Sequence, residues 1–134
     1  MRYLLNINIC IDLMNRQPPQ VLARFATLAY GDVAMSALTL AELRFGARVS
    51  ASRAQDEAAL NGLLDHVPAL PFGDAAAATY AALRAAVPGR RRDAIDRLIA
   101  AHDVSLGLTL VTNNEVDFAD CPGLTLENWV AADR

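Results

Sequence analysis

Lysine is absent from this sequence of 134 residues, and all twelve of its basic residues are arginine. The absence excludes a two-component receiver domain, a small α/β protein that places acids at strand ends but also needs a lysine late in the chain. It also leaves no ammonium group to neutralise a buried carboxylate. Arginine binds phosphate in a bidentate manner, so arginines near one site can offset the net charge of −3.

Cysteines, histidines and long apolar runs are scarce as well. We expect Cys10 and Cys121 to be free thiols, because Cys10 lies among apolar residues and a reducing compartment is expected. His66 and His102 are too few for a zinc site, and His102 is predicted to be packed in a helix. No apolar run approaches the ~18 residues of a membrane span, and polar residues interrupt the apolar N-terminus. We therefore expect a cytoplasmic protein with no signal peptide and no membrane partner.

What the sequence does contain is typical of one globular domain. Hydrophobic residues make up 54% and charged residues 20%, which is a folded rather than a disordered composition. A chain of this length builds one core of ordinary size. We therefore expect a single domain over residues 1–134.

Hydrophobic periodicity predicts strands that alternate with helices. The expected strands are residues 3–5, 33–35, 69–72 and 108–112. The expected helices are residues 9–15, 21–28, 36–49, 53–67 and 74–86, followed by one that carries Ile95 to His102 and stops at Gly107. Gly107 is the expected left-handed stop of the last helix, and Trp129 is expected to cover an edge of the core. Strands and helices in alternation indicate an α/β fold with a parallel sheet covered on both faces.

Polar residues follow the expected strands at the points where the strands end. The first strand, "YLL", stops at Asn6, and the strand "LTLV" runs into Thr112 and Asn114. The carboxyl ends of parallel strands are where ligands and catalytic groups collect in α/β proteins. Asp96 lies in the first turn of its helix, where the helix dipole favours an anion. The sequence therefore predicts a site at this edge of the sheet.

Glu42 lies in the stretch "SALTLAELRFG", which is so apolar that we expect the helix to be buried. A buried carboxylate needs a cation or hydrogen-bond donors, since alone it would take up a proton. A divalent ion shared by Glu42, Asp96 and a third acid would meet that need. Mg²⁺ or Mn²⁺ suits such all-oxygen ligands.

Four motifs in order give the chain its resemblance to a known family. They are "LLNINICIDL", "SALTLAELRFG", "DAIDRLIAAHDVSLGLTLVTNNEVDF" and "PGLTLENW". The whole chain resembles PIN-domain ribonucleases, specifically the VapC toxins of type II toxin-antitoxin pairs. That resemblance implies a Rossmann-like parallel sheet, a cluster of acids that binds Mg²⁺ or Mn²⁺, and cleavage of RNA.

The resemblance also assigns site residues. It implies metal ligands at the family's first three acidic positions, which are Asn6, Glu42 and Asp96 in this chain. The fourth acidic position falls on Asn114 or on Asp117. Two further polar residues, Asn8 and Thr112, match positions that line the same pocket.

The chain departs from the family at its first acid, because Asn6-Ile7-Asn8 stands where Asp-Thr-Asn is usual. The catalytic group is therefore expected to be Asn6, Glu42, Asp96 and Asp117, with Asp96 contacting the metal directly, Glu42 contacting it directly or through water, and Asp117 in an outer position. Asn6 predicts impaired activity. A catalytically silent PIN module that binds antitoxin or RNA without turnover is the alternative.

The resemblance further implies partners and products. The expected substrate is tRNA, with the anticodon loop of initiator tRNA as the target, and the products carry 5′-phosphate and 3′-hydroxyl ends. The expected protein partners are a VapB-type antitoxin, which blocks the site with arginine, and a second copy of the chain. The homodimer is also suggested by apolar residues in 21–30 and 38–49 beyond the needs of one small core.

Overall fold

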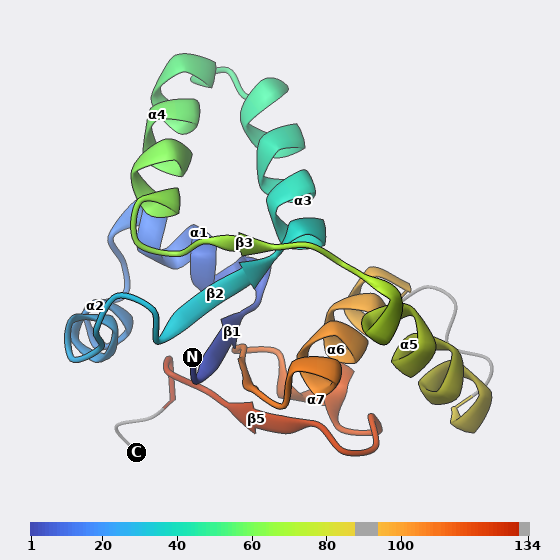
Figure 1. The fold of residues 1–134 in the computed structure, drawn as a ribbon. Helices are drawn as coiled ribbons and strands as arrows, with labels where there is room; N and C mark the ends of the chain where they lie inside the picture. The colour runs from blue at the N-terminus through green and yellow to red at the C-terminus, as the bar shows by residue number, and fades with distance from the viewer. Residues whose placement is uncertain (88–93, 132–134) are drawn as a thin grey trace.

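Five short strands form one parallel sheet in the computed structural model, which describes residues 1–87 and 94–131. The strands are β1 (Tyr3–Leu5), β2 (Val33–Ser36), β3 (Ala69–Leu70), β4 (Thr109–Val111) and β5 (Thr125–Glu127). They lie in the order β3-β2-β1-β4-β5, and every neighbouring pair is parallel (Figure 1). The predicted α/β fold with a parallel sheet is confirmed.

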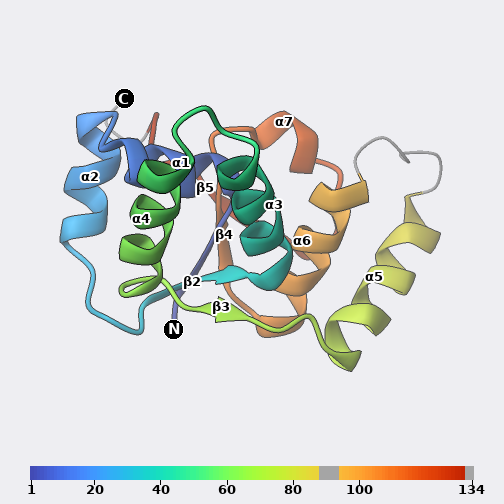
Figure 2. The same cartoon turned by 90° about the horizontal axis from the view of Figure 1, so that it is seen from above.

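Helices cover both faces of the sheet (Figure 2). They are α1 (Ile7–Asn15), α2 (Pro19–Ala26), α3 (Ala37–Arg48), α4 (Arg53–Leu64), α5 (Asp74–Ala86), α6 (Ala94–Leu106) and α7 (Glu115–Phe118). Side chains of α1 to α4 pack in one apolar cluster with Tyr3 and Leu5, while those of α5 to α7 pack in a second with Leu4. Alternate residues of β1 thus serve opposite faces. None of the helices in the described residues is long and apolar enough to cross a membrane.

The order of the strands creates a break in the winding direction between β1 and β4. After β1 the chain winds outward through β2 and β3, and it then returns to place β4 and β5 on the other side of β1. In open parallel sheets the crevice at the carboxyl ends of such a pair is the usual place for a ligand. The fold therefore indicates the ends of β1 and β4 as the place to look for a site.

The structure differs from the sequence prediction mainly at short elements. Helix α1 begins at Ile7, two residues before the predicted start, because Asn6 is its N-cap. The third strand is limited to Ala69–Leu70, and neither α7 nor β5 was expected. Gly107 has a φ of 68° after α6, as predicted. The run of three arginines at 90–92, which separates the predicted helix 74–86 from the next one, lies outside the described residues.

Helix α3 is not buried on all sides, which corrects the expectation from its apolar sequence. Its buried residues form one stripe, whereas the side chains of Phe45 and Val49 are 68% and 65% exposed. Glu42 is half-buried. The apolar residues of α3 therefore exceed what its own core stripe uses, and Glu42 keeps partial access to water.

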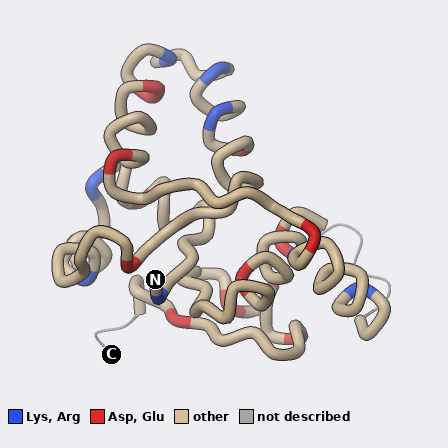
Figure 3. The backbone as a smooth tube through the Cα atoms, in the orientation of Figure 1, with Lys and Arg blue, Asp and Glu red and all other residues tan. Residues whose placement is uncertain are grey.

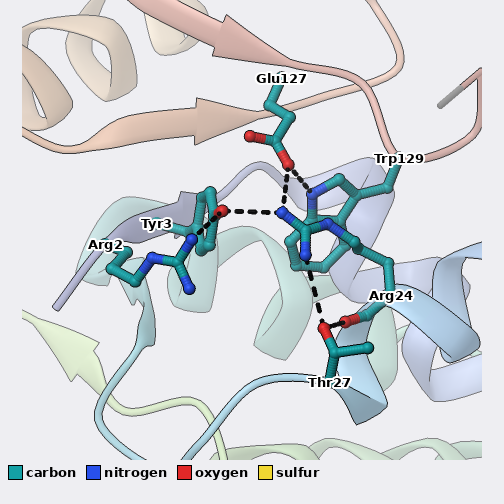
Figure 4. Close-up of polar contacts among 6 residues, drawn as sticks. All are labelled: Arg2, Tyr3, Arg24, Thr27, Glu127 and Trp129. Atoms are coloured by element: carbon teal, nitrogen blue, oxygen red, sulfur yellow. Dashed lines mark hydrogen bonds and ion pairs between the residues drawn. The ribbon is translucent and has the colours of Figure 1, made fainter.

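A polar cluster around Arg24 attaches α2 to β1 and β5 (Figure 4). Nη2 of Arg24 lies 3.0 Å from Oε1 of Glu127 and donates to the Tyr3 hydroxyl at 2.9 Å. Nε1 of Trp129 donates to the same Oε1 at 2.8 Å. Trp129 is fully buried edge-on to Tyr3, which confirms that it covers the core. We call Arg2, Tyr3, Arg24, Thr27, Glu127 and Trp129 the Arg24 cluster.

Both cysteines are free thiols, as the sequence predicted. Burial raises the pKa of Cys10 to about 12. A thiol that stays protonated is a poor nucleophile and a poor metal ligand. Cys10 is therefore a core residue rather than part of a site.

Candidate functional site

The carboxyl ends of β1 and β4 are joined through their backbones directly beneath the candidate site. The Asn6 N–H donates to the Val111 carbonyl at 2.9 Å, and the Thr112 N–H donates to the Glu127 carbonyl at 3.0 Å. Asn6 and Thr112 thereby continue neighbouring strands just past their last paired residues. Both are buried. The strand ends indicated by the strand order thus carry two buried polar residues, Asn6 and Thr112.

The hydroxyl of Thr112 is the centre of this arrangement. Its Oγ1 accepts from Nδ2 of Asn6 at 3.2 Å and from Nδ2 of Asn8 at 3.3 Å. The backbone N–H of Asn114 donates to it at 3.0 Å. Three of the residues predicted to line the pocket therefore meet at one atom, although Asn6 and Thr112 are 106 positions apart in the sequence.

The carbonyl oxygen of the Asn6 side chain has no hydrogen-bond partner, although the residue is only 3% exposed. An asparagine at a helix N-cap commonly accepts from a backbone N–H of the first turn, but Asn6 makes no such side-chain bond. Oδ1 of Asn8 is also buried without a partner. Buried acceptors are rarely left unsatisfied, and two together make this polar cluster suitable for a cation.

The turn after β4 fixes the outer wall of the site. Oδ1 of Asn113 accepts from Nδ2 of Asn8, a contact that the sequence did not indicate. Nδ2 of Asn114 donates to Oδ2 of Asp117 at 2.6 Å. Asn114 and Asp117 are therefore hydrogen-bonded to each other, so the two candidates for the fourth acidic position belong to one unit. The paired asparagines after "LTLVT" were the available signal for Asn113.

Glu42 and Asp96 lie on two different helices, α3 and α6. Both are half-buried, and Asp96 lies in the first turn of α6. Helix α6 contacts both α3, which carries Glu42, and α7, which carries Asp117. Within residues 1–87 and 94–131, no three His, Cys, Asp or Glu side chains form a group that could hold a metal ion. With asparagine at position 6, the carboxylates alone do not make a complete metal site.

The donor set nevertheless suits a hard divalent cation in its chemistry. All the side-chain acceptors in the polar cluster are oxygens, and Mg²⁺ and Mn²⁺ prefer oxygen ligands. Oδ1 of Asn6 is an unpartnered oxygen in this cluster. What the position lacks is negative charge, since an amide carbonyl offers an oxygen without the charge of a carboxylate.

Comparison with protein families matches the PIN domain over residues 3–124. Among curated proteins, the chain is 37% identical to the tRNA(fMet)-specific endonuclease VapC of Shigella flexneri, covering 96% of this chain and 98% of that one. It is 33% identical to ribonuclease VapC2 of Rickettsia felis, with the same coverage.

The chain also resembles solved structures of VapBC complexes. The DNA-bound VapBC of Salmonella typhimurium matches with a TM-score of 0.86 and 30% identity, covering 96% of this chain and 98% of that one. VapBC2 of Rickettsia felis, bound to a DNA fragment from its promoter, matches with a TM-score of 0.84 and 31% identity, covering 96% and 99%. These likenesses extend over almost the whole chain.

Proposed function

The chain belongs to the PIN-domain family and, within it, to the VapC group, and from this premise we propose that it is a metal-dependent endoribonuclease toxin of a toxin-antitoxin pair. The observation that carries the proposal is the polar cluster at the carboxyl ends of β1 and β4, where Asn6, Asn8 and Asn114 donate to the Thr112 hydroxyl. Two buried amide oxygens there have no donor, as expected of a place meant for a cation.

The metal-binding residues would be Asn6, Glu42 and Asp96, with Asp117 in an outer position. A divalent ion bound there supplies Lewis-acid stabilisation of charge on the phosphate oxygens. The chain's own residues would do the positioning. The Thr112 hydroxyl, which also accepts from Asn8, holds the Asn6 side chain, and Asn114 holds Asp117. In this proposal Asp117 would orient the attacking water. Water adds to phosphorus and the P–O3′ bond breaks, which gives 5′-phosphate and 3′-hydroxyl ends.

The substrate we propose is tRNA, with the anticodon loop of initiator tRNA as the target. Support comes from the Shigella flexneri relative, which is named as specific for tRNA(fMet). The chain also offers phosphate contacts in spite of its net charge. Arginines lie along α3 and at the start of α4 (Figure 3), where Arg44, Arg48 and Arg53 are exposed. RNA binding through such contacts should weaken as the salt concentration rises.

A catalytically silent PIN module is the second candidate function, and Asn6 is the observation that favours it. An amide at the leading position leaves Glu42, Asp96 and Asp117 as the carboxylates, and the described residues contain no group of three that could hold a metal. Such a module would still bind antitoxin or RNA.

Restoring the acid at position 6 distinguishes the two functions. Asn6→Asp keeps the size of the side chain and adds the missing charge, so we expect tighter Mn²⁺ binding and faster cleavage of a tRNA substrate. The loss of one preorganised contact costs about 3 to 4 kcal/mol, or roughly a few hundredfold in rate, and the gain should be of that size. The measurement is the single-turnover cleavage rate of both proteins at saturating Mn²⁺.

Adding Asp96→Asn to the Asn6→Asp protein is the control, and it should abolish the gain. Val116→Ala, at an exposed position of α7 next to Asp117, should leave the gain intact. Equal cleavage rates for the unmodified chain and the Asn6→Asp variant would show that position 6 is not a metal ligand. Absence of cleavage by both, with antitoxin binding retained, would favour the silent module.

We also propose a VapB-type antitoxin as protein partner, because the structural relatives are VapBC complexes. A carboxylate site without metal favours a guanidinium, so an arginine from the antitoxin would lie against Glu42 and Asp96. Affinity for the antitoxin should fall in a Glu42→Gln, Asp96→Asn double variant and stay unchanged in Glu57→Gln. An unchanged affinity in the double variant would mean that the antitoxin inhibits by covering the groove.

A two-fold homodimer is the second proposed assembly. Phe45 lies in the last turn of α3 and Val49 is the C-cap residue that follows the helix. Both are largely exposed, and large exposed apolar patches mark protein interfaces. Light scattering is expected to give a dimer mass at micromolar concentration, and Phe45→Ser with Val49→Ser should shift it to the monomer. A monomer mass for the parent at every concentration would contradict the homodimer.

A further inference from the structure

A buried hydrogen bond joins the helix that carries Glu42 to the helix that carries Asp96. Ser36 is the last residue of β2 and the N-cap of α3, where its Oγ accepts from the Leu38 N–H at 3.1 Å. Nδ1 of His102, on α6, lies 2.8 Å from the same Oγ. Ser36 is fully buried and His102 is 2% exposed. The bond therefore crosses between α3 and α6 in a place without access to water.

The partners of His102 fix the direction of each hydrogen bond. Burial lowers the pKa of His102, and a hydrogen bond to the backbone of Pro71 raises it. Proline has no N–H and can only accept, so the imidazole donates to Pro71. In the neutral ring the other nitrogen, Nδ1, is then an acceptor, and the Ser36 hydroxyl donates to it. The Ser36 hydroxyl thus accepts from the Leu38 N–H and donates to His102, and His102 in turn donates to Pro71.

An aromatic contact holds the ring in this orientation. Phe72 lies edge-on to His102, with ring centroids 5.4 Å apart and an interplanar angle of 75°. A neutral, oriented imidazole forms a directional contact that an apolar pair of the same volume would not supply. Because a hydrogen bond is directional, this contact restricts the relative placement of α3 and α6 more tightly than apolar packing would.

The spacing along the two helices connects this bond to the proposed site. Glu42 follows Ser36 by six residues, and Asp96 precedes His102 by six, which is about 9 Å along each axis at 1.5 Å per residue. Helix α3 leaves the carboxyl end of β2, whereas α6 runs back toward the start of β4. Glu42 therefore lies further along α3 than Ser36, and Asp96 lies nearer the start of α6 than His102, in both cases toward the carboxyl edge of the sheet.

We infer that Ser36 and His102 are positioning residues that set the separation of Glu42 and Asp96 and thereby the affinity of the site for a divalent cation. The inference rests on the proposed function, since it assumes that these two carboxylates share an ion. Neither Ser36 nor His102 touches that ion. Groups hydrogen-bonded directly to metal ligands typically change metal affinity by 10- to 100-fold when they are removed. Ser36 and His102 act on the two carboxylates through their helices, so we expect an effect at the low end of that range.

The test uses Asn6→Asp as the parent protein, so that the site has its full charge, and calorimetric titration with Mn²⁺ alone. Ser36→Ala and His102→Leu should each weaken Mn²⁺ binding by about tenfold. The double variant should be no weaker than either single variant, because removing one partner already breaks the unit. His102→Gln, which displaces the acceptor by one bond, replaces His102→Leu if the apolar variant does not fold.

Conservative variants separate positioning from mere structural support. Ser36→Thr keeps the hydroxyl and His102→Asn keeps an acceptor near the position of Nδ1, so both should bind Mn²⁺ within about twofold of the parent. Ser105→Ala is the matched control. It removes a hydroxyl on α6 that donates only to the His102 carbonyl within the same helix, and it should bind Mn²⁺ like the parent. Circular dichroism of each variant verifies that it is folded.

Parent-like Mn²⁺ affinity in folded Ser36→Ala and His102→Leu would overturn the inference and leave the proposed function standing. Additive losses in the double variant would overturn it too, because they indicate two independent packing effects. Failure of the Asn6→Asp parent to bind Mn²⁺ would overturn both the inference and the proposed metal site.

Discussion

The Arg24 cluster and the site around Thr112 are both polar and both draw on β1, but they differ in how their atoms are partnered. In the Arg24 cluster each acceptor is matched with donors. Oε1 of Glu127 accepts from Arg24 and Trp129, and the Tyr3 hydroxyl accepts from Arg24 and Arg2. The cluster carries opposite charges at close range and needs nothing further.

The site around Thr112 is arranged in the opposite way. Its donors converge on a single hydroxyl, and the amide oxygens of Asn6 and Asn8 receive none. Buried acceptors without donors destabilise a fold, so two such oxygens in one polar cluster are typical of a ligand-binding site. The comparison teaches that polarity and burial alone do not separate these two regions, whereas the balance of their donors and acceptors does.

The largest expected effect comes from breaking the Arg24 cluster at its buried aromatic residue. Trp129→Ala removes a fully buried side chain and the donor to Glu127. Large-to-small changes of this kind cost about 3 to 5 kcal/mol of unfolding free energy. Urea denaturation followed by circular dichroism measures the loss. A change below about 1 kcal/mol would show that the final segment is not part of the cooperative fold.

Asp103 provides a further test of the comparison. Its carboxylate is buried without a hydrogen-bond partner but belongs to neither the Arg24 cluster nor the site around Thr112. Burial raises the pKa of Asp103 to about 8. The folded state therefore binds a proton that the unfolded state releases above its normal pKa of ~3.9. Stability should fall as pH rises from about 4 to about 8 and then level off. Between about pH 5 and about pH 9 we expect a loss of about 2 to 4 kcal/mol.

Asp103→Asn cannot ionise, so denaturation midpoints of this variant should lose most of that pH dependence. Asp65→Asn, at an exposed position, should keep the slope of the parent. If the parent is equally stable at both ends of that pH range, Asp103 has a partner in solution and is no longer an exception to the balance seen in the Arg24 cluster.

A smaller effect is expected when only the charge of the Arg24 cluster is removed. Glu127→Gln keeps a carbonyl oxygen for Trp129 but weakens the ion pair with Arg24, in which both side chains are about one third exposed. Exposed pairs contribute about 0 to 1 kcal/mol, so the loss should stay under about 1 kcal/mol and shrink in high salt. Glu57→Gln, in the exposed pair with Arg53, is the matched control and should change less.

The smallest effect on stability is expected within the site itself. Asn8→Ala removes a donor to Thr112 and, with it, one unpartnered oxygen. The two contributions oppose each other, so unfolding free energy should change by less than about 0.5 kcal/mol. The same urea experiment measures it. A loss as large as that of Trp129→Ala would make the site a structural cluster and remove the distinction drawn above.

Periodicity predicted the sheet and most helices because these elements have long apolar stripes. Helix 74–86 was predicted with the bounds that the structure has. Elements of three or four residues, such as β5 and α7, were not predicted, since so few positions carry no detectable period. The burial expected for Glu42 was wrong in degree because an apolar helix can also expose its excess residues, as Phe45 and Val49 do.

The sequence predicted where in the fold the candidate site lies, but not which of its side chains hydrogen-bond to each other. Polar residues after strands indicated Asn6 and Thr112. The apolar surroundings of Glu42 and the helix start at Asp96 indicated those two acids, and the family resemblance added Asp117. That Thr112 collects donors from Asn6 and Asn8 follows from a strand order that one sequence does not reveal. The bond of His102 to Ser36 depends in the same way on how α6 lies against β2.

The neighbouring positions of β1 and β4 in the sheet have a consequence for the synthesis of this chain. Asn6 leaves the ribosome early, but its partner Thr112 follows 106 residues later, and β1 has no neighbour on that side until β4 emerges. Domains made during translation fold as their segments become available. A nascent chain that ends before β4 thus holds Asn6, Glu42 and Asp96 without the strand that assembles them. We therefore expect any activity of the site to begin only after β4 has been made, and a translation product that ends before β4 to be inactive.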